Sequence, residues 1–116
     1  MKVRLKDGGL DFEDPEDDMW RPIHLLYGKT YEVLGISSDW YRIIDEQKEP
    51  VLFHPDIFEV VDATEPADWI SRVGTDGERY AYPSELNVGL LEGFFNGDET
   101  AIRTFWEYVK SKGICF

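Results

Sequence analysis

The sequence predicts a mainly β protein of the α+β class. A five-stranded small barrel is expected over residues 1–62, and a β-hairpin and a C-terminal amphipathic helix are expected over residues 63–116. Three observations predict this fold. Short β-prone stretches follow one another closely in the first half of the chain. An Asp-Gly turn lies between two further β-prone stretches, and an apolar stripe at helical spacing ends the chain. Because such a stripe must be buried, we expect the second part to pack on the barrel.

Five segments are predicted as the barrel strands. In the first, polar side chains alternate with Val3 and Leu5, which is typical of a half-buried strand. The fourth ends before Pro55, because proline cannot donate a hydrogen bond to a ladder. The predicted strands are Lys2–Lys6, Thr30–Ile36, Trp40–Asp45, Val51–His54 and Phe58–Asp62.

The second part of the chain contains a predicted hairpin and a segment of uncertain type. Trp69–Val73 and Glu78–Tyr82 flank a Gly-Thr-Asp-Gly turn, and this pattern indicates a hairpin. In Asn87–Phe95 two glycines interrupt an otherwise helical pattern, so the sequence leaves this segment undecided.

The last element is predicted as a helix that begins at Asn96 and ends before Gly113. Asn96 and Glu99 have the spacing of a capping box, and glycine is a common helix stop. The apolar stripe of this helix consists of Ala101, Ile102, Phe105, Trp106 and Val109.

A long acidic loop is expected between the first two strands. Residues Asp7–Asp18 contain seven acidic residues and no basic one. Glycine and proline interrupt this segment, so we expect a solvated loop that continues to about Tyr27. Repulsion between like charges should keep its tip open.

The composition limits the classes of partner and the compartment. The chain has 24 acidic and 12 basic residues and a net charge of −12, which opposes binding to nucleic acids and anionic membranes and favours basic protein surfaces. Its single cysteine cannot form an internal disulfide or a multi-thiolate zinc site. No apolar run approaches a membrane span, and the N-terminus is too short and polar for a signal peptide. We therefore expect a cytoplasmic protein; its oligomeric state stays open.

No pattern in the sequence predicts catalysis. His24 and His54 have no serine, cysteine or second histidine at a recognisable spacing, and Cys115 lies next to the terminus. The acidic loop lacks the spaced ligands and turn glycine of a calcium loop. We expect no cofactor, no metal and no enzymatic activity.

The barrel segment resembles SH3 domains. In that family a tryptophan opens the third strand, and a proline and an aromatic residue three positions later sit in the turn before the last strand. Trp40, Pro55 and Phe58 match these positions, and the acidic loop matches in place. The segments Met1–Arg4 and Gly28–Val33 are also similar to those of small bacterial and phage-associated SH3-like proteins. The resemblance implies a barrel and an aromatic groove. Phe58 lacks the hydroxyl that would bond a ligand carbonyl, which argues against polyproline recognition.

Three functions are consistent with these observations. The first is a non-catalytic interaction module that binds a basic protein surface. The second is an immunity protein, an inhibitor or a DNA mimic that neutralises a nuclease or a nucleic-acid-binding protein. The third is a metal protein or enzyme that uses the acidic loop and His54. The residues predicted to contact a partner are Asp14, Glu16, Asp17, Asp18, Trp20, Tyr27, Trp40, Pro55 and Phe58. If the C-terminal helix packed on the same barrel face, it would fill the groove.

Overall fold

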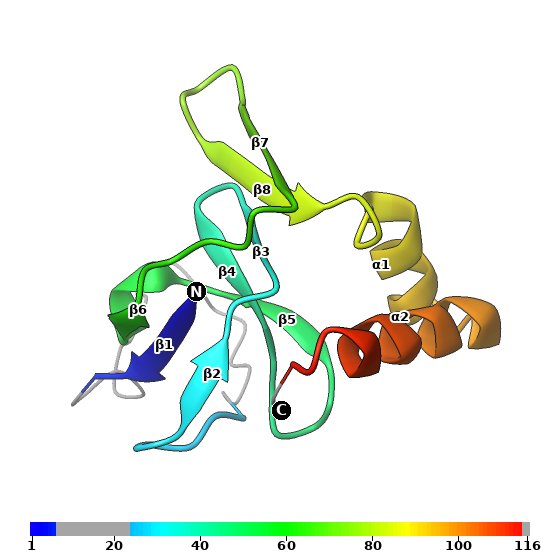
Figure 1. The fold of residues 1–116 in the computed structure, drawn as a ribbon, viewed down its shortest axis with the longest axis horizontal. Coiled ribbons are helices and arrows are strands. Elements are labelled where there is room, and N and C mark those ends of the chain that lie inside the picture. The colour runs from blue at the N-terminus through cyan, green and yellow to red at the C-terminus, as the bar shows by residue number, and fades with distance from the viewer. Residues whose placement is uncertain (7–23, 115–116) are drawn as a thin grey trace, which may run out of the picture.

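The computed structural model describes residues 1–6 and 24–114. It contains two antiparallel sheets and two helices (Figure 1), which confirms the predicted mainly β class. Among the described residues, the strand pairing does not close into a barrel. The acidic loop and its predicted site residues Asp14, Glu16, Asp17, Asp18 and Trp20 lie outside the described residues, as does Cys115.

The elements agree closely with the predicted ones. The structure has the strands β1 (Lys2–Leu5), β2 (Thr30–Glu32), β3 (Gly35–Ser37), β4 (Trp40–Ile44), β5 (Pro50–Phe53), β6 (Phe58–Asp62), β7 (Trp69–Val73) and β8 (Arg79–Pro83), and the helices η2 (Pro55–Ile57), α1 (Val88–Phe95) and α2 (Glu99–Ser111). The short 3₁₀ helix η2 begins at Pro55, where strand pairing was expected to stop.

The predicted second strand is divided between the two sheets. The N–H of Val33 donates to the carbonyl of Met1 at 2.9 Å, next to the sheet of order β2-β1-β6. The next N–H, of Leu34, donates to the carbonyl of Arg42 at 2.8 Å in the other sheet. The chain therefore passes from one sheet to the other between these residues. The prediction of one continuous strand was wrong, because sequence alone does not show that the strand bends to change partners.

The predicted hairpin extends the second sheet. That sheet has the order β5-β4-β3-β8-β7, and β8 joins β3 where Ile36 pairs with Ala81. The hairpin therefore continues the sheet edge to edge. Its tip projects away from the other described elements (Figure 1).

Two hydrophobic cores stabilise the molecule. The first lies between the sheets and contains Val3, Leu5, Leu25, Tyr31, Val33, Ile36, Ile43, Phe53, Ile57, Phe58 and Ala81. The second lies between the helices and the five-stranded sheet and contains Leu34, Ile44, Leu86, Leu91, Phe105 and Val109. Leu34 and Ile44 therefore connect the strands of the first half to the helical part.

The segment that the sequence left undecided is helical. Asn87 caps α1, since its side-chain oxygen accepts from the N–H of Leu90 at 2.9 Å. The predicted capping box of the last helix was wrong. The cap of α2 is Asp98, which accepts from the N–H groups of Thr100 at 2.9 Å and Ala101 at 3.1 Å. Asn96 instead ends α1, because the two helices are joined too tightly for it to cap the second.

The end of α2 agrees with the prediction. The helix ends at Ser111, and Gly113 follows with φ of +64°, a conformation that glycine adopts readily. Phe105 and Val109 of the predicted stripe are fully buried. Neither described helix is long and apolar enough to cross a lipid bilayer.

Candidate functional site

The candidate site is one face of the five-stranded sheet. Arg42 of β4 pairs with Gly35 of β3, and Ile70 of β7 pairs with Tyr82 of β8. Gly35 and Tyr82 are neighbours where β3 meets β8. The next row on this face consists, from β4 to β7, of Trp40, Ser37, Tyr80 and Arg72. Because side chains alternate between the faces of a sheet, these two rows point to the same side. We call the part formed by Ser37, Arg42, Ile70, Arg72, Tyr80 and Tyr82 the groove face.

Gly35 allows the Tyr82 ring to lie across β3. A Cβ atom at position 35 would be 2.2 Å from Cδ1 of Tyr82 and 2.9 Å from the carbonyl oxygen of Ala81. The ring therefore occupies the space that a side chain would need. In this position the Tyr82 hydroxyl accepts a hydrogen bond from Nε of Arg42 at 3.2 Å.

A groove of about 700 Å³ runs between the groove face and α1. The helix contributes Val88, Leu91 and Phe95 to its wall. Several apolar side chains at the groove are open to solvent, with exposed fractions of 64% for Ile70, 66% for Val88 and 51% for Phe95. Exposed apolar side chains that gather around one concavity are typical of a binding site.

The groove carries an excess of one positive charge in a chain that is strongly acidic overall. Arg42 and Arg72 line it, and Glu92 is the one acidic residue among the described side chains around it. Arg42 also donates from Nη1 to the carbonyl of Pro50 at 2.8 Å. The guanidinium of Arg72 lies 4.8 Å from the centre of the Tyr80 ring.

Neither arginine of the groove forms an ion pair with a described carboxylate. Their partners are a hydroxyl, a carbonyl and an aromatic ring. In contrast, Arg4 is paired with Glu59, and Arg79 with Glu65. The two guanidinium groups of the groove therefore remain available to a negatively charged ligand.

The end of the sheet at Trp40 is acidic. The Trp40 side chain is 43% exposed, and its ring meets the His54 ring edge-on at 5.2 Å. Asp39 precedes Trp40 in the chain, and Asp56 lies 3.6 Å from Nδ1 of His54. Burial raises the pKa of Tyr41, and the negative charges of Asp56 and Glu65 raise it further.

The structure brings together only some of the predicted site residues. Pro55 follows His54 and is therefore near Trp40. Tyr27 is 49% exposed, but its segment lies at the other end of β4, where the N–H of Glu46 donates to the carbonyl of His24 at 2.8 Å. We call Asp39, Trp40, His54, Pro55 and Asp56 the Trp40 surface.

Phe58 belongs to the core and not to this surface. Its exposed fraction is 7%, and its ring packs against Phe53 at 6.2 Å and Tyr41 at 6.0 Å. Its predicted role in contacting a partner does not fit this burial. Phe58 is the first residue of β6, and at this position of the strand its side chain points into the first core.

Sequence reasoning did not identify the groove face. The alternation in the hairpin places Ile70 with Arg72, and Tyr80 with Tyr82, on common faces. That signal was present in the sequence. This alternation does not show that β8 pairs with β3 or that α1 forms one wall, so the groove could not be predicted from it.

A polar network at the other end of β4 has a structural role. The Tyr31 hydroxyl donates to the Glu46 carboxylate at 2.7 Å and accepts from the N–H of Leu26 at 2.8 Å. Lys29 also donates to Glu46 at 2.7 Å. Burial and the bond to Glu46 raise the pKa of Tyr31 to about 12, while the bonds from Lys29 and Tyr31 lower the pKa of Glu46. The network fixes the start of β2 to the turn after β4.

Within residues 1–6 and 24–114, no three histidine, cysteine or acidic side chains gather as metal ligands would. His54 caps η2, since its Nδ1 accepts from the N–H of Asp56 at 3.1 Å.

Comparison with known proteins gives no match to any family model, curated protein or solved structure. The geometry of the two surfaces therefore carries the functional argument.

Proposed function

We propose that the protein is a non-catalytic, cytoplasmic interaction module that binds a basic surface of another protein. The observation that carries this proposal is the exposed Trp40 ring at an acidic end of the sheet. Tryptophan is enriched among the residues that dominate binding energy, because it buries a large apolar area with few rotatable bonds. Asp39 and Asp56 beside it would face the cationic side chains of the partner.

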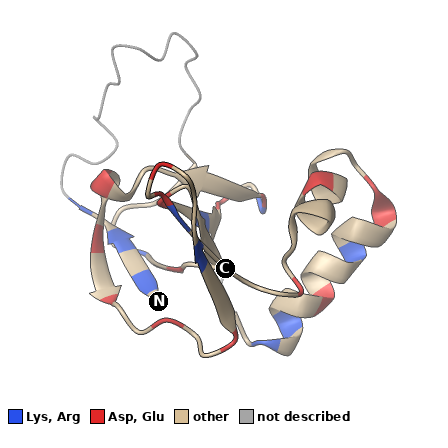
Figure 2. Ribbon diagram, turned by 90° about the horizontal axis from the view of Figure 1, so that it is seen from above, with Lys and Arg blue, Asp and Glu red and all other residues tan. Residues whose placement is uncertain are grey.

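The charge of the whole chain supports the same partner chemistry. A net charge of −12 attracts basic surfaces over distances of about 10 Å and accelerates their encounter. Figure 2 shows that acidic and basic positions are interspersed over the described elements, with both signs on α2. The Trp40 surface differs because it combines local negative charge with an exposed aromatic ring.

We also propose that the first 62 residues are related in architecture to SH3-like barrels. The bent β2–β3 segment contributes to both sheets, which is how small barrels turn their corners. The 3₁₀ helix η2 precedes the last strand of this part, and the Trp40 ring meets His54, the residue before Pro55. The burial of Phe58, which has no hydroxyl, argues against a polyproline ligand.

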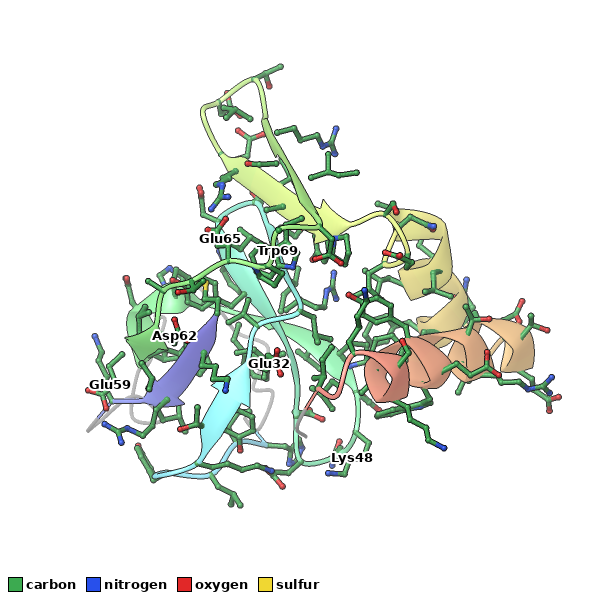
Figure 3. All side chains as sticks on the ribbon, viewed as in Figure 1. Glu32, Lys48, Glu59, Asp62, Glu65 and Trp69 are labelled. Carbon is green, nitrogen blue, oxygen red and sulfur yellow. The ribbon has the colours of Figure 1, made fainter. Side chains whose placement is uncertain are left out.

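The alternative function, an inhibitor or DNA mimic, has less support from the described residues. A mimic needs unpaired carboxylates along one surface. Glu59, Asp62 and Glu65 follow one another along β6 and the segment after it (Figure 3). However, Glu59 is paired with Arg4, and Glu65 with Arg79, which partly neutralises this row.

Affinity capture from a lysate of the native host, at low and high salt, tests the proposal. We expect basic proteins to be retained by the wild type and to be lost with Trp40→Ala. The matched control is Val60→Ala, because Val60 is 48% exposed on the opposite sheet. If Trp40→Ala retains the same proteins as the wild type, or none is retained at either salt concentration, the proposal is wrong.

A charge-matched pair of variants separates local from overall electrostatics. Asp39→Asn with Asp56→Asn changes the net charge as much as Glu99→Gln with Glu107→Gln on α2. We expect only the first pair to release a captured basic protein. Equal release by both pairs would mean that net charge, and not the Trp40 surface, holds the partner. Direct competition by duplex DNA would instead favour the inhibitor.

A further inference from the structure

We infer that the open edge of β7 and the groove beside it bind an extended peptide segment of a partner protein. The segment pairs with β7 as an added strand and places an acidic side chain, next to an apolar one, in the groove. This inference goes beyond the proposed function, because β7, the groove face and α1 carry it instead of the Trp40 surface.

The hydrogen-bonding pattern of β7 leaves backbone groups open on its outer side. This strand is the last in its sheet, and no described strand pairs with its outer side. The N–H of Gly74 donates to the carbonyl of Glu78 at 2.7 Å. Because bonded and non-bonded pairs alternate in an antiparallel ladder, Arg72 then bonds with Tyr80. The backbone N–H and C=O groups of Ser71 and Val73 therefore face the open edge.

The edge strand β7 has few of the features that protect edge strands from pairing. Proteins blunt such edges with charged side chains, above all lysine, and with proline, bulges or covering segments. The one charged side chain of β7, Arg72, lies over the Tyr80 ring. Trp69–Val73 contains neither proline nor lysine, and its register with β8 is continuous. Ile70 is 64% exposed and Val73 is 69% exposed. Addition of a strand to such an edge is a recurring mode of peptide recognition.

The charge of Arg72 is complementary to an acidic side chain on an added strand. An added strand would place every second side chain over the groove, next to Ile70 and Arg72. Arg72 lies on β7 itself, lacks a described carboxylate partner and would meet this row of side chains. A carboxylate there gains charge-assisted hydrogen bonds from guanidinium groups. The groove-facing position on the Ile70 side of the acid would lie toward Val88 and Phe95 on α1, which favours an apolar side chain there.

A second copy of this chain fits the edge less well. Antiparallel pairing of two β7 strands about Ser71 would place Ile70 opposite Arg72 of the copy, so that neither groove receives a carboxylate. Two chains that each carry a net charge of −12 also repel each other. A short segment with one acid avoids both problems.

Calorimetric titration with three capped heptapeptides tests the inference. Each peptide has valine at the two groove-facing positions that flank a central glutamate, glutamine or lysine, and threonine at all other positions. We expect the glutamate peptide to bind about tenfold more tightly than the lysine peptide, with glutamine between them. Arg72→Gln should reduce that preference to about threefold or less, whereas the matched control Arg103→Gln on α2 should retain it. Tighter binding of the lysine peptide, or no binding of any peptide, would overturn the inference.

Peptides with N-methylated amides test the added strand without altering the protein. Methylation of the amides that face β7 should abolish binding, whereas methylation of the intervening amides should preserve it. Ser71→Pro should also abolish binding while retaining the β7–β8 ladder, because the Ser71 N–H faces outward. Equal binding of both methylated forms would overturn the inference.

Two further measurements separate this inference from its alternatives. Trp40→Ala should leave the peptide affinity within about twofold, so failure of this inference and failure of the proposed function can be told apart. Sedimentation equilibrium detects self-association. A dimer that Ser71→Pro dissociates would show that a second copy occupies the edge, which would overturn the inference.

Discussion

At the scale of single residues, Gly35 determines the geometry of the candidate site. The absence of a side chain lets the Tyr82 ring cross β3 and reach Nε of Arg42. Arg42 is held in turn by the carbonyl of Pro50. One glycine thus positions an aromatic ring and a cation that the groove uses.

Replacement of Gly35 should disrupt both stability and the groove. In Gly35→Ala the new methyl group would meet the Tyr82 ring and the carbonyl of Ala81, so we expect a loss of about 1–3 kcal/mol in the free energy of unfolding. Urea denaturation measures this loss. The matched control is Gly89→Ala in α1, where the nearest atom is a side-chain oxygen 3.3 Å away, and a change below about 1 kcal/mol is expected. Equal effects of the two variants would contradict this account of Gly35.

The buried tyrosine network predicts a dependence of stability on pH. The folded pKa of Tyr31, about 12, exceeds its unfolded value of 10.0. The stabilisation is therefore complete below pH 10 and is lost as the pH rises from 10 to 12. The expected loss is about 2–3 kcal/mol from this residue. Tyr108, whose pKa is also raised to about 12, adds a second contribution in the same range.

Urea denaturation between pH 9 and 12 checks this prediction. Tyr31→Phe should make the loss of stability between pH 10 and 12 smaller by the contribution of one tyrosine. The variant should also be less stable at neutral pH by about 1–2 kcal/mol, because the N–H of Leu26 loses its acceptor. A variant with the same pH profile as the wild type would show that Tyr31 does not titrate in this way.

At the scale of elements, the turn between α1 and α2 shows what local sequence can and cannot decide. Asn96 and Glu99 have the spacing of a capping box, yet Asp98 caps α2. Both Asn96 and Asp98 are good capping residues. The choice depends on where α1 ends, and the sequence did not show that α1 exists.

Two alanine variants distinguish the predicted cap from the observed one. Asp98→Ala removes the acceptor of two N–H groups of α2 and should lower the free energy of unfolding by about 0.5–2 kcal/mol. Asn96→Ala should cost less, because its side chain does not cap α2. Thermal or urea denaturation of both variants provides the comparison. A larger loss of the free energy of unfolding in Asn96→Ala than in Asp98→Ala would support the predicted capping box instead.

The strands also show what local sequence cannot decide, because their pairing depends on residues that lie far apart in the chain. Alternation and turn residues predicted the positions of the strands and the hairpin, because these signals are local. The bend between Val33 and Leu34 depends on two partners, Met1 and Arg42, that lie far apart in sequence. The groove depends further on the pairing of β3 with β8. Sequence therefore predicted Trp40 as a site residue but not the arginines of the groove.

At the scale of the whole molecule, the two halves of the chain share both hydrophobic cores. Ala81 from the hairpin is fully buried in the first core. Leu34 and Ile44 from the first half are buried in the second, against Phe105 and Val109 of α2. Trp69 also packs against the first core from the base of the hairpin (Figure 3). The segment of residues 63–116 thus completes the structure of the first half.

A fragment of residues 1–62 should not form the stable fold alone. It would lose Ala81 and Trp69 from the first core and expose Leu34 and Ile44. Each large apolar side chain that returns to water costs about 1.5–3 kcal/mol, which is a substantial part of the total stability of a small domain. Thermal unfolding followed by circular dichroism checks this prediction. A cooperative transition near that of the full chain would show that the first half is an independent domain.

The central claim is that the exposed Trp40 ring, at the acidic end of the five-stranded sheet, binds a basic surface of a partner protein. The most direct test is ¹⁵N chemical-shift mapping of the full chain with a protein captured from the native lysate. The account predicts that the largest shifts lie at the Trp40 indole and at Asp39, His54 and Asp56 beside it. Shifts confined to the solvent-facing side of α2 or to β6 would contradict it.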